Sequence, residues 1–296
     1  MAPVNATPKI QLERLLYTHY QHQNLAAANK FFTDFGFIPV QQSDDIVYYR
    51  GFGDSPYIYV AERSPDKSKH FVGGGWVVKS QTDLEAASRL PGASQIQEST
   101  APGGGQYVDV QDLNGINVRL IYGITYRGRE KLEQELPKAV VFNSWEDKQR
   151  KGEFQRFDAG PSKVHKLGHY GLVVDKSNFD STVAWYTQTF GLAPTDSLFD
   201  EESGKDTMTF MHIDKGEEFT DHHPRFDASG NIVEHYSDGD LVNKNSVVTR
   251  EKAAPDTMAV WGPNVSFAFL TGRIEDISKG PAVPEVKKVP DFMLQK

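Results

Sequence analysis

The residues best suited to chemistry lie in the last third of the chain, around one short segment that ends in a carboxylate. Ile232 and Val233 follow the turn at 227–230 and lead into Glu234, which predicts a short strand with the acidic side chain at its end. A strand fixes the direction of a side chain, and a carboxylate oxygen is a suitable ligand for a divalent cation. Glu234 is therefore a candidate metal ligand, and a solvated charge at a sheet edge is the alternative.

Three histidines are candidates for sharing such a metal with Glu234. His169 lies in the apolar run 167–174, which predicts a strand, and His222 and His223 are adjacent further along the chain. Taken alone, a histidine in a strand is more often packed or hydrogen-bonded than bound to a metal. The chain contains no cysteine, so any metal must be held by His, Asp and Glu, and disulfides and a cysteine nucleophile are excluded.

Two further side chains each have a functional or a structural interpretation. Tyr236 lies two residues beyond Glu234 on the same face of the predicted strand, where it could line a substrate pocket or serve equally well as a core tyrosine. His212 is expected to be structural, because alternation places it on the opposite face from Met211 and Ile213.

The segments that must position these residues repeat one order, a strand and a helix followed by further strands. Apolar residues at helical spacing predict helices at 24–33, near 84–90 and at 179–189. The predicted strands lie at 15–20, 46–50, 57–60, 71–78, 106–110, 116–122, 167–174 and 207–213. No Lys-Ser or Lys-Thr follows the glycine-rich 102–105, so a hairpin loop is favoured there over a phosphate-binding loop. We therefore predict an α+β protein built from βαβββ units.

Two short glycine-containing sequence patterns, called landmarks below, each occur twice and indicate that the chain arose by duplication. The recurring pairs are 35–37 with 190–192, and 112–120 with 227–235. Counting from the glycines places Arg119 opposite Glu234 and Arg14 opposite His169. The N-terminal half thus carries cations where the C-terminal half carries possible ligands, so we expect a metal only in the second half.

The chain divides into four predicted parts. These are an N-terminal half with two βαβββ modules and no metal at 11–125, a charged linker at 126–166, a C-terminal half at 167–243 and a tail at 244–296. The C-terminal half is expected to hold module three and the final strand of an incomplete module four.

Composition excludes several partners. The formal net charge is −8 with basic and acidic residues interspersed, so no nucleic-acid partner is expected. No apolar run approaches the roughly 20 residues of a membrane helix, and the first residues lack a signal-peptide pattern. Zero cysteine fits a reducing compartment. We expect a cytoplasmic protein that acts on a small molecule, without a membrane partner.

His169 in LGHYGLVV, the sequence Asp-His-His at 221–223 and Glu234 in EHYSDGDLVN together resemble the vicinal oxygen chelate superfamily. Over about residues 12–243 the sequence looks most like the extradiol dioxygenases of the catechol 2,3-dioxygenase type and the fungal glyoxalase/dioxygenase-domain proteins. The resemblance implies paired βαβββ modules in open barrels, with Fe(II), or Mn(II) in some members, held by two histidines and one glutamate. It also implies a small aromatic substrate, dioxygen and cleavage of a catechol-type ring.

The family roles carry over to individual residues. His169 matches the histidine ligand on the first strand of module three, and Glu234 matches the carboxylate ligand on the last strand of module four. His223 matches the histidine that the family uses as an acid or base or to handle bound dioxygen.

The sequence departs from the family pattern in module four. In the second module about forty residues separate the opening strand at Phe71 from the turn at 114–115, whereas only 224–228 separate the double histidine from the matching turn at 229–230. The absent part would carry a strand, a helix and the second histidine ligand. Of the three metal ligands that the resemblance implies, only His169 and Glu234 remain.

Three interpretations stay open. In the first, His222 or His223 becomes the third ligand. In the second, 232–236 is the last strand of module three, and a homodimer completes a glyoxalase-like site with two His and two Glu. In the third, the chain is a non-catalytic remnant or binding protein of the same fold, which associates with a full-length relative through its exposed strand edges. Apolar residues left uncovered by the incomplete module would then favour self-association or poor solubility.

Overall fold

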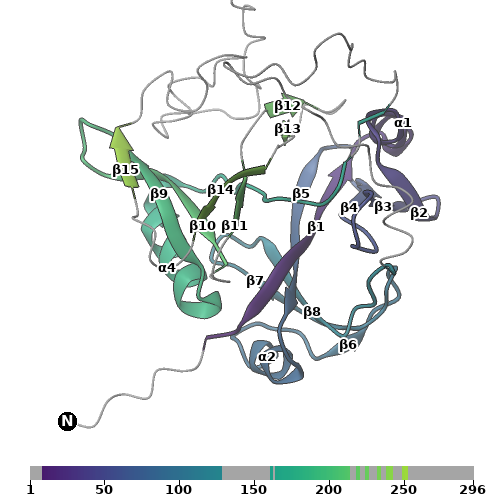
Figure 1. Cartoon of the computed structure of the whole chain (residues 1–296), viewed down its shortest axis with the longest axis horizontal. Helices are drawn as coiled ribbons and strands as arrows, with labels where there is room; N and C mark the ends of the chain where they lie inside the picture. The colour runs from purple at the N-terminus through teal and green to yellow at the C-terminus, as the bar shows by residue number, and fades with distance from the viewer. Residues whose placement is uncertain are drawn as a thin grey trace, which may run out of the picture.

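Two successive modules form the N-terminal half of the computed structural model, which describes residues 9–128, 161–162, 164–213, 218–220, 224–226, 232–234, 238–242 and 249–252. The first module is β1 (Leu12–His22), α1 (Leu25–Phe35), β2 (Ile38–Gln42), β3 (Ile46–Arg50) and β4 (Tyr59–Arg63) (Figure 1). The second is β5 (His70–Val78), α2 (Gln81–Ala87), β6 (Gln97–Glu98), β7 (Gln106–Gln111) and β8 (Asn117–Tyr122). The predicted α+β class and the predicted βαβββ order are confirmed.

The eight strands of these modules form one mixed sheet in the order β2-β3-β4-β1-β5-β8-β7-β6. The modules join through β1 and β5, which run antiparallel with Thr18 opposite Gly74. Each of these two strands also pairs in parallel with the last strand of its own module, β1 with β4 and β5 with β8. Residues 102–105 lie in the loop of the β6–β7 hairpin, as predicted.

Alternating side chains give this sheet two chemically different faces. Both helices cover one face, called the outer face below. There α1 packs through Leu25, Ala28 and Phe32, and α2 packs through Leu84 and Ala87. The opposite face, called the inner face, carries a third cluster that includes Tyr17, Tyr57, Val60, Val77 and Ile121.

Helix ends follow the sequence signals. The side chain of Asn24 accepts a hydrogen bond of 3.0 Å from the Ala27 N–H and caps α1. The helix ends at Gly36, which has a φ of 124°, a backbone conformation that glycine adopts without the steric cost of a Cβ. Gly191, with a φ of 68°, ends the helix of the C-terminal half in the same way, so the recurring landmark is a pair of helix C-caps.

The C-terminal half begins with α4 (Phe179–Phe190), which follows a short 3-10 turn, η1 (Lys176–Asn178). A three-stranded sheet combines β9 (Ala193–Phe199), β10 (Asp206–His212) and β15 (Thr249–Lys252), so residues beyond 243 contribute to it. Two separate pairs follow, β11 (Glu218–Thr220) with β14 (Asp238–Val242) and β12 (Pro224–Phe226) with β13 (Ile232–Glu234). No helix among the described residues is long and apolar enough to cross a membrane.

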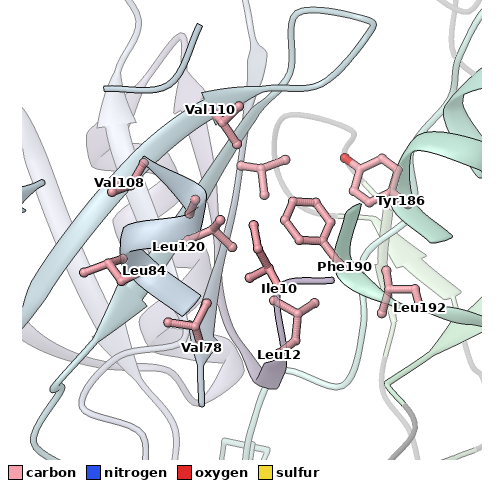
Figure 2. Close-up of a cluster of buried hydrophobic side chains, with 12 residues drawn as sticks. Ile10, Leu12, Val78, Leu84, Val108, Val110, Leu120, Tyr186, Phe190 and Leu192 are labelled. Atoms are coloured by element: carbon pink, nitrogen blue, oxygen red, sulfur yellow. The ribbon is translucent and has the colours of Figure 1, made fainter. Parts of the chain in front are cut away.

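Helix α4 packs on the N-terminal half through its last turns. Figure 2 shows Tyr186, Phe190 and Leu192 facing Ile10, Leu12 and Leu120 across the junction. All of these side chains are buried in one cluster with the residues under α2. The two halves therefore share a hydrophobic core and are expected to unfold together.

Residues 167–174 form no strand, contrary to the sequence prediction. Several of the apolar side chains that predicted one are partly buried against the outer side of the N-terminal half, whereas Val173 is 58% exposed. Leu167 packs on the cluster under α1, Leu172 packs on the cluster under α2, and Tyr170 contacts Phe71 and Trp76 of β5. Side-chain packing against a neighbouring sheet thus gives the same apolar pattern as a strand.

Gly74 makes this arrangement possible. Trp76 donates a hydrogen bond of 3.2 Å from Nε1 to the Tyr170 hydroxyl, and the Tyr170 ring lies directly over Gly74. A Cβ at Gly74 would lie 2.6 Å from Tyr170 Cε1. Burial raises the pKa of Tyr170 to about 12, so the hydroxyl stays protonated and available for hydrogen bonding.

We predict that Gly74→Ala displaces Tyr170 and lowers the free energy of unfolding by about 1–3 kcal/mol, the usual cost of overpacking. Gly171→Ala is the matched control, because Gly171 is exposed and a Cβ there meets nothing within 4 Å. Urea titration of both variants measures the difference. Equal midpoints would show that Tyr170 does not hold this segment in place.

Candidate functional site

Glu234 is placed by the β12–β13 hairpin. In that hairpin Phe226 pairs with Ile232, Arg225 with Val233 and Pro224 with Glu234. Glu234 therefore lies across from Pro224, the residue that follows His222 and His223 in the chain.

The β7–β8 hairpin of the N-terminal half has the same register. Gln111 pairs with Asn117, Val110 with Val118 and Asp109 with Arg119. Five residues connect the strands in each hairpin, 112–116 in one and 227–231 in the other. Arg119 and Glu234 are thus both in the third pair from the turn, which agrees with the alignment made from the sequence.

The remaining predicted site residues are only partly placed. His222, His223 and Tyr236 lie outside the described residues. His169 is half-buried in the packed segment between Leu167 and Tyr170 rather than on a strand. Within the part of the chain that the structure describes, no three His, Asp or Glu residues come together to form a metal site.

His212 lies at the end of β10 and is buried, with an exposed fraction of 8%. Met211 and Ile213 pack on the cluster at α4, so alternation turns His212 toward the other face of its sheet. Its Nδ1 lies 2.7 Å from the Thr195 hydroxyl. This contact fixes the ring, in keeping with the structural role predicted for it.

The inner face of the N-terminal sheet carries charged groups that sequence reasoning did not single out as a site. Arg119 pairs with Asp109 through two hydrogen bonds, 2.8 Å from Nε and 2.7 Å from Nη2. Its guanidinium carbon also lies 3.9 Å from the centre of the Tyr107 ring. Burial alone would lower the pKa of Arg119, but the hydrogen bonds and charge of Asp109 outweigh burial and raise it.

A second polar pair lies on β1 and β4. His19 Nε2 lies 3.0 Å from Glu62 Oε2, and the Gln21 amide donates to the same oxygen at 3.0 Å. Burial lowers the pKa of His19 below its ordinary value, although the charge of Glu62 opposes the change. The imidazole is therefore neutral near pH 7.

Side chains on distant strands of the inner face interact. Arg119 lies on β8 and Tyr48 on β3, four strand spacings apart in the sheet order, which is about 19 Å in a flat sheet. The charge of Arg119 nevertheless acts on the Tyr48 hydroxyl and on those of Tyr17 and Tyr57. Side chains from distant strands therefore converge over the inner face.

A separate hollow of about 400 Å³ lies at the turn between β7 and β8. Its lining includes Leu113, Asn114, Val173 and Asn178. The two asparagines already bond to each other at 3.3 Å across the junction of the halves. None of the predicted site residues lines this hollow, and we assign it no chemistry.

Comparison with solved structures identifies the fold. The structure is similar to the Mn(II)-bound glyoxalase from Novosphingobium aromaticivorans, with a TM-score of 0.65, 14% identity, and coverage of 94% of this chain and 99% of that one. It is also similar to homoprotocatechuate 2,3-dioxygenase from Brevibacterium fuscum in complex with 3,4-dihydroxyphenylacetate, with a TM-score of 0.66, 15% identity, and coverage of 91% and 94%.

A third similar structure is an extradiol ring-cleaving dioxygenase from B. fuscum, with a TM-score of 0.64, 15% identity, and coverage of 92% and 84%. The sequence itself matches no protein family and no curated protein. At this identity the likeness concerns the fold. The chain has the vicinal oxygen chelate fold shared by glyoxalases and extradiol dioxygenases, and the resemblance drawn from the sequence is confirmed at that level.

Proposed function

We propose that the protein is an extradiol ring-cleaving dioxygenase that opens a catechol-type aromatic with dioxygen at a site in its C-terminal half. In this proposal His169, His222 and Glu234 hold Fe(II), or Mn(II), and His223 and Tyr236 contact the substrate. The observation that supports this proposal most directly is the register of β12 and β13, in which Glu234 pairs with Pro224, the residue after the double histidine.

The donor set suits such a metal. Two imidazoles and one carboxylate form the donor set of non-haem Fe(II) oxygenases, which leave positions open for substrate and oxygen. Glu234 and Pro224 form the third pair from the turn in a short hairpin, so the ladder fixes the backbone position of Glu234. Metal bound there would supply the activation of the catechol and of dioxygen.

The roles of the other residues follow from their chemistry. A catechol must lose a proton to bind through both oxygens, and His223 is the base proposed to accept it. Tyr236 would line the ring of the substrate. Both oxygen atoms of dioxygen enter the product, so the reaction needs no external reductant.

We expect the full chain, loaded with Fe(II) under anaerobic conditions, to retain about one metal ion per chain. Glu234→Gln should weaken retention by more than about tenfold, because loss of a direct ligand costs at least as much as loss of a residue that orients one. Glu85→Gln, on the exposed side of α2, changes the charge equally and is the control. Elemental analysis after gel filtration gives the ratio.

Oxygen uptake with a catechol then separates the enzyme classes. Metal retention with ring cleavage and oxygen uptake supports the dioxygenase. Metal retention in a dimer that consumes no oxygen supports the glyoxalase-like site completed by two chains. That alternative is favoured by the likeness to a Mn(II)-bound glyoxalase over 94% of this chain and 99% of that chain.

The second candidate function is a non-catalytic binding protein of the same fold. It is favoured by His169, which lies in a segment packed on the N-terminal half rather than on a strand of a C-terminal barrel. Absence of retained metal from the wild-type chain would establish this candidate in place of the dioxygenase.

A further inference from the structure

We propose that residues 164–172, called the latch segment below, regulate the proposed metal site by moving between two positions. In the docked position, which is the one in the structure, the segment holds His169 on the N-terminal half. In the released position it becomes the first strand of the C-terminal half and brings His169 beside Glu234. This proposal rests on the proposed function, because it concerns the same metal site.

The latch segment matches the first strand of the second module in sequence. Residues 71–78 read FVGGGWVV and residues 167–174 read LGHYGLVV, and both stretches end in two valines. This match sets His169 against Gly73 of β5. The segment therefore has the sequence of a module's first strand, although it forms no strand in the docked position.

The register of β5 with β8 indicates how such a strand pairs in the C-terminal half. Gly73 pairs in parallel with Asn117, and the second landmark aligns Asn117 with Ile232. By the same register the released segment pairs with β13, and His169 lies opposite Ile232. Glu234 is two residues further along β13 on the same face, so the Cα atoms of His169 and Glu234 are about 8 Å apart. Side chains at this separation reach one shared ion.

Backbone contacts with the loop after β3 hold one end of the docked segment. The Phe52 N–H donates to the Val164 carbonyl at 2.7 Å. The Gly53 N–H donates to the His165 carbonyl at 2.8 Å. A Cβ at Gly51 or Gly53 would lie 2.6 Å from the His165 carbonyl oxygen, so the absence of a side chain at both positions permits this close approach.

Side chains on either side of His169 hold the rest of the segment. Leu167 packs on the cluster under α1, and Leu172 packs on the cluster under α2. Between them the ring of Tyr170 covers Gly74 of β5. His169 is thus kept on the N-terminal half by its neighbours in the chain.

The docked segment is held weakly enough to be released. Val164 is the only buried side chain among residues 164–172, and the others are half-buried or exposed. A segment with so few buried side chains opens at a lower free energy than the core of the sheet. A metal that binds only the released position shifts the equilibrium toward it. Docking therefore lowers the apparent metal affinity in proportion to the fraction of chains that are docked.

Mn(II) titration of the full-length chain, followed by the EPR signal of free Mn(II), tests the latch. Gly74→Ala displaces Tyr170 without changing a proposed ligand, so it should tighten Mn(II) binding by about fivefold or more. Trp76→Phe removes the hydrogen-bond donor to the Tyr170 hydroxyl and should act in the same direction. Ile121→Val, in the inner-face cluster away from the segment, is the control and should leave the affinity unchanged.

A residue that merely supports the fold would not raise metal affinity when it is changed. Glu234→Gln added to Gly74→Ala should remove the gain, which locates the gain at the proposed metal site. Unchanged or weaker Mn(II) binding in both Gly74→Ala and Trp76→Phe overturns the latch. Absence of Mn(II) from every variant contradicts the proposed function instead, and the latch is then decided by hydrogen exchange.

Amide hydrogen exchange gives a readout that needs no metal. The Phe52 and Gly53 amides donate to the docked segment, so they should exchange by local opening, about tenfold or more faster than the Leu120 amide in the sheet. Gly74→Ala should speed their exchange further, and so should excess Mn(II) with the wild-type chain. Exchange of both amides only through global unfolding means that the segment never leaves the N-terminal half, and this result overturns the latch whether or not metal binds.

Discussion

Phe190→Ala is expected to lower the free energy of unfolding by about 3–5 kcal/mol and to destabilise both halves together. Phe190 is 4% exposed at the end of α4 and belongs to the cluster that also buries Ile10, Leu12 and Leu120. Its ring packs edge-on against Trp185, with centres 5.1 Å apart. Removing it opens a cavity at the junction that packed neighbours cannot fill without moving the helix.

Polar contacts at the same junction increase the expected effect. The Tyr186 hydroxyl donates to Asp112 Oδ2 at 3.2 Å, and the Asn114 amide donates to Thr182 at 3.0 Å. These bonds join α4 to the turn between β7 and β8 and depend on the position of the helix. A shift of α4 after loss of Phe190 would therefore strain buried hydrogen bonds as well as reduce apolar packing.

The measurement is urea unfolding followed by circular dichroism, with Val173→Ala as the control. Val173 is 58% exposed, so its truncation should change the free energy of unfolding by less than about 0.5 kcal/mol. A single cooperative transition that moves to lower urea in Phe190→Ala is the expected result. A loss below about 1 kcal/mol, or separate transitions for the two halves, would show that α4 is not part of a shared core.

Local signals in the sequence predicted the parts of the fold that depend on near neighbours. The two glycine landmarks correctly predicted the ends of α1 and α4, because a residue with positive φ is needed at each helix end. The self-match around Arg119 and Glu234 correctly aligned two hairpins with the same register. The register of a hairpin is fixed by its own turn, so a short stretch of sequence is enough to predict which residues pair.

The parts that were missed depend on distant residues or weak patterns. Leu167 and Leu172 suggested a strand, but their partners are clusters formed by residues far away in the sequence. Strand β2 has the sequence IPVQQ, with an internal proline and no apolar alternation, and β6 has only two residues. The pairing of β1 with β5 brought His19, Glu62 and Arg119 to one face, which no local pattern indicates.

Asp109→Leu is expected to lower the free energy of unfolding by about 3 kcal/mol, because it leaves the Arg119 guanidinium partly buried without its counter-charge. Arg119 and Asp109 are each 28% exposed, which reduces the loss below that of a fully buried pair. Asp45→Leu is the control, since Asp45 pairs with Arg63 on the surface, where both side chains are more than half exposed. That change should cost no more than about 1 kcal/mol.

A double variant tests whether the charge itself causes the loss. Arg119→Met removes the unpaired cation, so Asp109→Leu combined with Arg119→Met should be more stable than Asp109→Leu alone. The apolar pair keeps contact with Tyr107 and needs no counter-ion, and such replacements are often neutral or stabilising. If the double variant is instead as unstable as the sum of the two single variants, the inner face depends on packing by each side chain rather than on their pairing.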